Sequence, residues 1–248
     1  MSTDPGARGS AAVTPEQAPV LELVGARAAY GAIPVLHGVD LAVAPGSVVA
    51  LLGPNGGGKS TTMKVVTGLL PLTGGELRLA GRRVNGLSAQ EIARLGVCAI
   101  PEGRGVFPNL TVRENLWIAT GTGTELKRLE EVAYGRFPIL GKRRNQLAGS
   151  MSGGEQQMLA LSRALATDPA VLLLDELSMG LAPMIVTQMY ETVAELVAGG
   201  LSVLVAEQFA RVVLPIADTA ALMLHGRIVD TGTPDEIEGR LSSEYLGG

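Results

Sequence analysis

The stretch from residue 53 to residue 60, Gly-Pro-Asn-Gly-Gly-Gly-Lys-Ser, constrains the fold of this chain more than any other. It fits the pattern G-x-x-x-x-G-K-[ST] at every fixed position. Before it, residues 47–52 form a short apolar run that is typical of a buried strand. After it, residues 61–68 contain no Pro and are typical of a helix. A match placed between a strand and a helix predicts a loop that cradles phosphate groups.

Each residue type in this loop suits the binding of phosphate. The glycines allow a tight turn that points backbone N–H groups inward, and the start of the following helix adds partial positive charge. Lys59 is expected to reach the β- and γ-phosphates of a nucleoside triphosphate, and Ser60 to offer its hydroxyl to Mg²⁺. The flanking pattern disfavours the alternative, a glycine-rich turn that only precedes a helix. The predicted nucleotide-binding residues of the loop are Gly53, Pro54, Asn55, Gly56, Gly57, Gly58, Lys59, Ser60 and Thr61.

The composition excludes several other classes of protein. With 248 residues, of which 46% are hydrophobic, the chain can bury a substantial core. Its net charge is −4 and it has no dense cluster of Lys and Arg, which disfavours nucleic-acid binding. It contains no run of 18 apolar residues, so no membrane span is expected. Residues 1–19 lack the apolar segment of a secretory signal and are predicted to be a mobile, disordered tail. Cys98, the single cysteine, is expected to be a core residue.

Strands and helices alternate along the chain, which predicts an α/β fold with a parallel sheet. The most apolar run, residues 170–174, ends at Asp175 and Glu176. A second buried run, residues 201–206, is followed by Glu207 and Gln208. Open α/β sheets place their ligand chemistry at the carboxyl ends of such strands.

The remaining elements predict additions to this parallel sheet. Residues 20–28 and 35–43 favour a pair of antiparallel strands before it. Residues 220–224 and 227–230 favour a hairpin after it, joined by a His-Gly turn. Residues 110–150 contain helix patterns and no strong strand pattern, which indicates a small helical insert.

Tyr30 stands at a predicted break between two strands, just upstream of the phosphate loop. Because aromatic faces bind bases by stacking, we predict that Tyr30 stacks on adenine. A core role is the alternative for this side chain.

A second candidate anion site lies at Ser152, Gly153 and Gly154, directly before a strongly helical run. The Ser hydroxyl and the backbone N–H groups of the two glycines could hold a phosphate at the start of a helix. Taken alone, the same residues are equally compatible with a plain helix cap.

Together these motifs resemble the nucleotide-binding subunit of ATP-binding cassette (ABC) transporters, over residues 20–248. The Walker A motif of that family corresponds to residues 53–60, its signature motif to residues 151–155 and its Walker B strand to residues 171–176. The resemblance implies an α/β P-loop NTPase core with a mixed sheet, an antiparallel β subdomain and a helical insert at about residues 103–165.

The resemblance also implies roles for the site residues. ATP and Mg²⁺ are the expected ligands: Asp175 would help hold the metal and Glu176 would polarise the attacking water. The signature of one subunit would close over the γ-phosphate in the cradle of another, in a head-to-tail homodimer or heterodimer. The other implied partners are an integral membrane permease and, indirectly, an extracytoplasmic solute-binding protein. The subunit would be cytoplasmic, peripheral on the inner face of the cell membrane.

Four positions depart from the common pattern of the family. They are Glu102 for a usual Gln, Leu177 for a usual Pro, Ala182 for a common Asp, and Gln208 for a common His. Together with the segments Pro-Glu-Gly-Arg, Gly-Leu-Ala-Pro and Glu-Gln, they resemble the second ATPase subunit of branched-chain amino acid importers.

Two of these departures affect the predicted site directly. A Gln can donate a hydrogen bond to the γ-phosphate but does not titrate near neutral pH, so Gln208 is predicted as a phosphate sensor. We predict Glu176, Lys59 and Gln208 as the catalytic residues. Glu102 could ligate Mg²⁺ or water, beside Ser60 and Asp175, or could act only through the conformation of its loop.

Three readings therefore compete. The first is the ATPase of a branched-chain amino acid importer, with a urea or short-amide importer as its close alternative. The second is a related ATPase that acts on DNA or ribosomes, for which the required basic patches are missing. The third is a regulatory subunit that binds nucleotide and hydrolyses it poorly.

Overall fold

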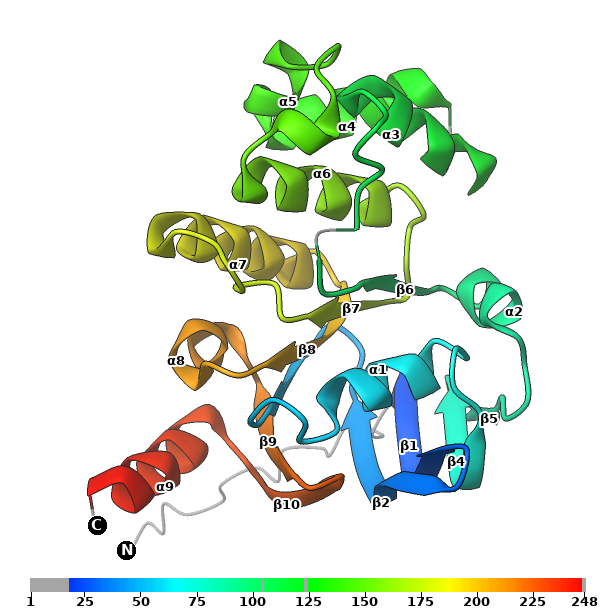
Figure 1. Cartoon of the computed structure of the whole chain (residues 1–248), viewed down its shortest axis with the longest axis vertical. Helices are drawn as coiled ribbons and strands as arrows, with labels where there is room; N and C mark the ends of the chain where they lie inside the picture. The colour runs from blue at the N-terminus through cyan, green and yellow to red at the C-terminus, as the bar shows by residue number, and fades with distance from the viewer. Residues whose placement is uncertain (1–17, 104, 123–124, 247–248) are drawn as a thin grey trace, which may run out of the picture.

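The computed structural model describes residues 18–103, 105–122 and 125–246, which form two sheets and the helices around them (Figure 1). The tail predicted at residues 1–19 falls almost entirely on residues 1–17, outside the described residues. In the part of the chain that the structure describes, no helix is long and apolar enough to cross a membrane.

The larger sheet has six strands in the order β10-β9-β3-β8-β7-β6. Strands β9, β3, β8, β7 and β6 run parallel, and β10 pairs antiparallel with β9. The predicted parallel sheet and the hairpin after it are therefore confirmed. The strands are β3 (Val48–Leu52), β6 (Val97–Ile100), β7 (Val171–Asp175), β8 (Ser202–Glu207), β9 (Thr219–Leu224) and β10 (Arg227–Gly232).

The smaller sheet is antiparallel, in the order β2-β1-β4-β5. It lies at one end of the molecule, beside α1 (Figure 1). Two of its strands match the predicted pair before the phosphate loop, each extended by two residues at the turn that follows Tyr30. Its strands are β1 (Leu21–Tyr30), β2 (Ile33–Val43), β4 (Leu72–Leu79) and β5 (Arg82–Arg83).

Strand β3 explains why the parallel strands are apolar at every position. Val48, Ala50 and Leu52 belong to one buried cluster, and Val49 and Leu51 belong to another. Because successive side chains of a strand point to opposite faces, the sheet is covered on both faces. One cover consists of α1 (Lys59–Val66), α2 (Ala89–Arg94) and the antiparallel sheet, and the other consists of the remaining helices.

Helices follow one another through most of the segment between β6 and β7, as the sequence predicts. They are α3 (Val112–Ile118), α4 (Leu126–Arg136), α5 (Pro138–Lys142) and α6 (Gly153–Leu165), with 3₁₀ turns at Ala119–Thr122 and Ala148–Ser150. In Figure 1, α3, α4 and α5 lie at the end of the molecule opposite the antiparallel sheet. The later helices are α7 (Pro183–Ala198), α8 (Ala210–Val213), the 3₁₀ turn Leu214–Ile216 and α9 (Pro234–Leu246).

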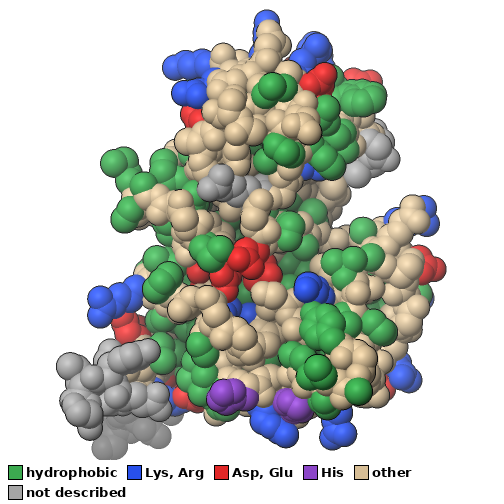
Figure 2. All heavy atoms as spheres, viewed as in Figure 1, with side chains coloured by type: hydrophobic (Ala, Val, Ile, Leu, Met, Phe, Trp, Pro, Cys, Tyr) green, Lys and Arg blue, Asp and Glu red, His purple; other side chains and the backbone are tan. Residues whose placement is uncertain are grey.

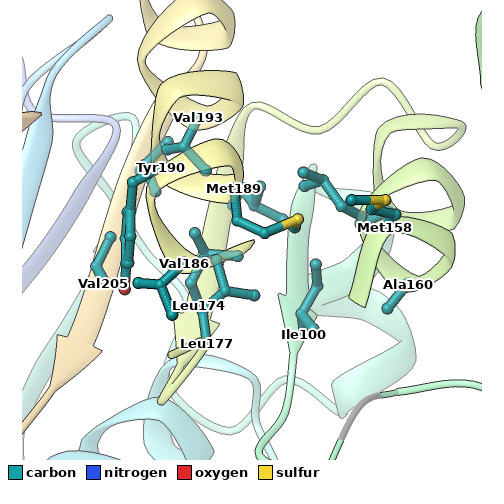
Figure 3. Close-up of a cluster of buried hydrophobic side chains, with 14 of the residues drawn as sticks. Ile100, Met158, Ala160, Leu174, Leu177, Val186, Met189, Tyr190, Val193 and Val205 are labelled. Atoms are coloured by element: carbon teal, nitrogen blue, oxygen red, sulfur yellow. The ribbon is translucent and has the colours of Figure 1, made fainter. Parts of the chain in front are cut away.

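The packing of α7 fixes the loop that follows β7. Figure 3 shows Val186, Met189, Tyr190 and Val193 directed from this helix toward the sheet, where Leu174 and Val205 lie. All six side chains are buried. At about 1.5–3 kcal/mol for each large apolar side chain removed from water, these contacts hold α7 firmly on the sheet. Cys98 packs at the margin of the same cluster, and burial raises the pKa of its thiol, in line with the predicted core role.

Candidate functional site: a phosphate cradle beside two carboxylates

A cleft of about 310 Å³ opens at the start of α1. It collects residues from four separate parts of the chain: β2, the phosphate loop with the start of α1, the loop after β6 and the end of β7. All but one of its lining residues were predicted as site residues; the exception is Val35, on β2. The lining residues are Val35, Asn55, Gly56, Gly58, Lys59, Ser60, Thr61, Glu102 and Glu176.

The phosphate loop depends on glycine at its start and at its end. Gly58 forms the N-cap of α1 with φ 113°, a conformation that side chains disfavour, and no side chain caps this helix. A Cβ at Gly53 would lie 2.2 Å from the carbonyl oxygen of Met223 on β9. The N–H of Gly226, in the turn after β9, donates to the carbonyl of Gly57 at 2.8 Å. The loop therefore rests on the β9–β10 hairpin, and the first turn of α1 keeps its N–H groups for a ligand.

Lys59 is buried in the cleft, with 3% of its side chain exposed. Its ammonium donates to the carbonyl oxygens of Gly53, at 2.8 Å, and Pro54, at 3.1 Å, and it lies 3.3 Å from Oε1 of Glu176. Each of these partners is an oxygen with full or partial negative charge, as the oxygens of a phosphate are. The cradle thus holds a cation where phosphate charge is expected.

Ser60 and Asp175 come together although 115 residues separate them, with the Ser hydroxyl donating to Oδ1 at 3.3 Å. Burial raises the pKa of Asp175 above its usual range, and the negative charges of Glu176 and Glu102 raise it further. Mg²⁺ prefers one or two carboxylates, with phosphates and waters as its other ligands. One hydroxyl and one carboxylate beside a phosphate cradle therefore fit Mg²⁺. Among the described residues, no three His, Cys, Asp or Glu side chains are placed to hold a metal by themselves.

Acidic side chains dominate this part of the surface. Figure 2 shows a group of them at the middle of one face, where Figure 1 places β7 and β8. The two His side chains of the chain, His37 and His225, lie at the edge of the same face near β2 and β10. The site therefore has carboxylates and a lysine for proton and charge chemistry, and no histidine.

Glu176 follows β7 with φ 50°, which is uncommon for a residue with a side chain. Its N–H donates to the carbonyl of Ala206 on β8 at 2.9 Å. The backbone is thus anchored to the neighbouring strand while the side chain turns back into the cleft toward Lys59. This placement makes Glu176 the carboxylate best positioned to act on a ligand of the cradle.

Gln208 and Tyr30 lie near this cleft but do not line it. Gln208 is exposed directly after β8 and, with Gly53 and Pro54, lines a neighbouring groove. Tyr30 is 43% exposed at the end of β1. The ammonium of Lys64, on α1, lies 5.5 Å from its ring and 3.3 Å from its hydroxyl. The ring is therefore open to solvent next to the helix that begins at the cradle.

The second candidate anion site is at the start of α6, on the other side of the sheet from α1 (Figure 1). The Ser152 hydroxyl accepts from the N–H of Glu155, and the Glu155 carboxylate accepts from the N–H of Ser152. Within one chain this segment is thus a complete capping box. The structure does not bring Ser152, Gly153 or Gly154 to the cradle of the same chain.

Sequence reasoning missed a buried carboxylate next to the site. Glu207 is only 1% exposed and accepts hydrogen bonds from Ser178 and Tyr190. The sequence indicated a carboxylate after an apolar strand, but the hydroxyl donors are spread over a loop and a helix, and their convergence depends on tertiary packing.

Known proteins of similar sequence identify the family. The sequence profile of the protein family described as "ABC transporter" matches residues 36–178, more than half of the chain. The chain belongs to the ABC transporter family. Among its relatives, the high-affinity branched-chain amino acid transport ATP-binding protein BraG of Pseudomonas aeruginosa is 42% identical over 88% of this chain and 96% of that protein.

Two further relatives of this ABC transporter subunit agree with the assignment. The probable branched-chain amino acid transport ATP-binding protein LivF of Archaeoglobus fulgidus is 36% identical over 88% of this chain and 94% of that protein. A solved ADP conformation of an ATP-binding cassette from an ABC transporter is 27% identical, with a TM-score of 0.79 over 92% of this chain and 96% of that one. The predicted family and fold are confirmed, and the chain is an ABC ATPase, an ATP-binding subunit of a transporter.

Proposed function

We propose that this ABC ATPase powers the uptake of branched-chain amino acids through a separate membrane permease. The observation that carries the proposal is the 42% identity to BraG over nearly the whole of both chains. The cleft supports it, because the residues needed to bind and hydrolyse a nucleoside triphosphate meet there. Residues 20–248 would form one ATPase domain, with the helical insert at about residues 103–165 within it.

The side chains of the cleft have distinct roles in this proposal. Lys59 moves from the carbonyls of Gly53 and Pro54 to the β- and γ-phosphates, and its departure frees Glu176 to orient the attacking water and accept its proton. Ser60 and Asp175 hold Mg²⁺, with Glu102 as a further candidate ligand. The metal supplies neutralisation of phosphate charge.

Three more residues complete the proposed nucleotide site. Tyr30 stacks on adenine, and Gln208 donates to the γ-phosphate. Ser152 and the two glycines after it act on the nucleotide of a second ATPase subunit, in a head-to-tail pair. This role requires the partner, since α1 and α6 of one chain lie on opposite sides of the sheet.

The surface that transmits the motion to the permease lies around residues 102–120. Phe107, Trp117 and Ile118 are exposed there, Trp117 by 61%. Beside them is an apolar groove of about 190 Å³, lined in part by Pro101, Ile118 and Ala160. An apolar segment of the permease on the inner face of the cell membrane would fit this groove. A solute-binding protein would act indirectly, through the permease.

The catalytic part of the proposal is tested by ATPase assays of the purified subunit and of Glu176→Gln. Removing the general base is expected to lower kcat about 10²–10⁴-fold and to leave the dissociation constant for ATP within a few-fold. If the native subunit shows no measurable ATP turnover at any concentration of Mg-ATP, the regulatory subunit is the better assignment.

The solute is tested by uptake in cells that lack the gene. Complementation with the native subunit is expected to restore uptake of labelled leucine, and Glu176→Gln is expected not to do so. Urea and acetamide serve as comparison solutes in the same cells. Restoration of urea or amide uptake without leucine uptake would replace the branched-chain assignment.

A further inference from the structure

Glu207 is the most completely buried carboxylate among the described residues, at the last position of β8. Its Oε1 accepts from the hydroxyl of Tyr190 at 2.6 Å and from the N–H of Ser178 at 3.0 Å. Its Oε2 accepts from the hydroxyl of Ser178 at 2.8 Å. Three donors from two elements thus converge on one side chain, and within the described residues Glu207 forms no ion pair.

The backbone around Glu207 also forms hydrogen bonds with the nucleotide site. Its carbonyl accepts from the N–H of Gly53, at 3.3 Å, where the phosphate loop begins. The preceding carbonyl, of Ala206, accepts from the N–H of Glu176. Gln208, the predicted γ-phosphate sensor, is the next residue. Two consecutive residues of β8 therefore contact the cradle and the general base, and the predicted sensor follows directly after them.

The side chain of Glu207 extends these contacts to the loop between β7 and α7. Ser178, which it binds twice, lies two residues after Glu176. The loop is tight, since the N–H of Met179 donates to the carbonyl of Glu176 at 3.2 Å and that of Leu181 to the carbonyl of Ser178 at 3.3 Å. Holding Ser178 therefore fixes the backbone on the carboxyl side of Glu176, where φ is left-handed.

Tyr190, from α7, also fixes the carboxylate. It projects from α7 toward the sheet and lies beside Val205, with its hydroxyl at the end nearer the loop (Figure 3). Burial and the negative charge of Glu207 raise the pKa of Tyr190 well above its usual value, so its hydroxyl remains a donor. Since α7 is packed on the sheet, Glu207 cannot turn away from the loop without losing this bond.

We propose that Glu207 is a positioning residue, whose carboxylate holds the Ser178 loop so that Glu176 is aligned with the phosphate cradle. The inference rests on the proposed role of Glu176 as general base. Glu207 does not touch the nucleotide: it acts on hydrolysis by fixing the geometry of Glu176, and not on the binding of nucleotide.

The test compares two substitutions of nearly equal size. Glu207→Gln keeps an acceptor for Tyr190 and the Ser178 N–H, and its amide can donate to the Ser178 hydroxyl, so the hydrogen bonds survive without the charge. Glu207→Leu removes all of them. For Glu207→Leu, kcat is expected to fall about 10- to 100-fold, as small misplacements of reacting groups produce. The KM for Mg-ATP and the affinity for ADP are expected to stay within about threefold. Glu207→Gln is expected to have a kcat within about threefold of the native value.

Removal of the donors tests the same contact from the other side. Ser178→Ala and Tyr190→Phe each delete one hydroxyl and leave the carboxylate in place. Their effects on kcat are expected to be non-additive with that of Glu207→Leu, because all three remove parts of one unit. If Glu207→Leu does not fold, the double variant Ser178→Ala/Tyr190→Phe carries the test, with kcat lowered and KM retained.

Several results would overturn the inference. One is native kcat in folded Glu207→Leu, and another is equal loss in Glu207→Gln and Glu207→Leu, which would point to charge and not to position. A rise in KM at unchanged kcat would also contradict it. Glu176→Gln is assayed in parallel: if it is inactive while Glu207→Leu is fully active, only the role of Glu207 fails. If Glu176→Gln retains native turnover, the role of Glu176 itself fails.

Discussion

Helix α1 follows Gly58 and helix α6 begins at Gly153, and both helix starts were predicted to bind phosphate, yet the two are built differently. In α1 the N-cap is Gly58, without any side-chain cap. In α6 the N-cap is Ser152, which forms a reciprocal capping box with Glu155. Arg143 lies 3.3 Å from the Glu155 carboxylate and covers it further. The first helix is open to a ligand, and the second is satisfied by its own residues.

This difference indicates how each end can contribute to an ATP site. The open end of α1 can bind phosphate within one chain, since its N–H groups lack side-chain partners and Lys59 is adjacent. The end of α6 has a carboxylate in its first turn, which already complements the helix dipole. Phosphate binding at α6 therefore needs additional positive charge from elsewhere. When a nucleotide lies in the cradle of a second subunit, the lysine of that cradle and the bound metal would provide this charge.

The largest expected effect is that of Lys59→Ala. The substitution removes the cation expected to stabilise the transferring phosphate and leaves Glu176 without its partner. kcat/KM is expected to fall about 10²–10³-fold, as for the loss of one transition-state donor, measured by steady-state ATPase assay. Lys142→Ala, which removes an exposed lysine at the end of α5, is the charge-matched control. Equal effects of the two variants would contradict a special role for the open end of α1.

Alanine substitution of a glycine near the start of α1 and of one at the start of α6 should destabilise the protein for different reasons. At Gly154 a Cβ would lie 2.5 Å from Cγ2 of Ile185, so Gly154→Ala is expected to cost about 1–3 kcal/mol by overpacking. At Gly56 nothing lies within 4 Å, but φ is +76°, so Gly56→Ala is expected to cost about 1–2 kcal/mol by backbone strain. Urea denaturation measures both. Adding Ile185→Ala should reduce the loss of unfolding free energy in Gly154→Ala and not in Gly56→Ala. An unchanged loss in Gly154→Ala would exclude a clash with Ile185 as its cause.

Removal of the α6 cap should have a smaller effect on stability. Ser152→Ala is expected to cost about 1 kcal/mol of unfolding free energy, measured by urea denaturation. Ser88→Ala removes a box of the same kind at α2, away from the cleft, and is the matched control. If α6 acts on the nucleotide of a partner, ATPase activity falls in Ser152→Ala and not in Ser88→Ala. Equal activity in both would leave α6 with a capping role alone.

The smallest expected effect is a shift in the titration of a capping glutamate. The side-chain hydrogen bond from Ser88 holds the pKa of Glu91 below its usual value of 4.5. The box therefore adds stability above pH 4.5, and this contribution is lost as pH falls through the lowered pKa. In Ser88→Ala the pKa should rise toward 4.5, as followed by NMR titration of the Glu91 carboxyl. An unchanged pKa would show that the backbone bond alone sets it.

Much of the fold could be predicted from local chemistry. The possible helix cap at Ser152 and the hairpin turn at His225 and Gly226 were visible in the sequence and are present in the structure. The apolar runs that became β3, β7 and β8 were equally clear, because strands buried on both faces have no alternation to interpret. These features depend on neighbours along the chain.

The parts of the site that could not be predicted depend on contacts between distant segments. The ion pair between Lys59 and Glu176 requires knowledge of where the cradle stands relative to β7. The network of Glu207 requires Tyr190 to face the sheet one turn after Val186, which follows from the packing of α7. The rule that ligands bind at the carboxyl ends of parallel strands and the motifs of the resembling family placed Asp175 and Glu176 near the cradle in advance, but neither indicated that Glu176 pairs with Lys59.

The position of β3 has a consequence for how the protein is made. The strand that leads into the cradle lies between β8 and β9, and the loop after it rests on Met223 and Gly226. All of these supports follow the antiparallel sheet, the helical insert and β7 along the chain, so the ribosome delivers them after those segments. The nascent chain can complete its nucleotide site only after β8 and β9 have been made, so the segments before them begin to fold without the supports of the cradle.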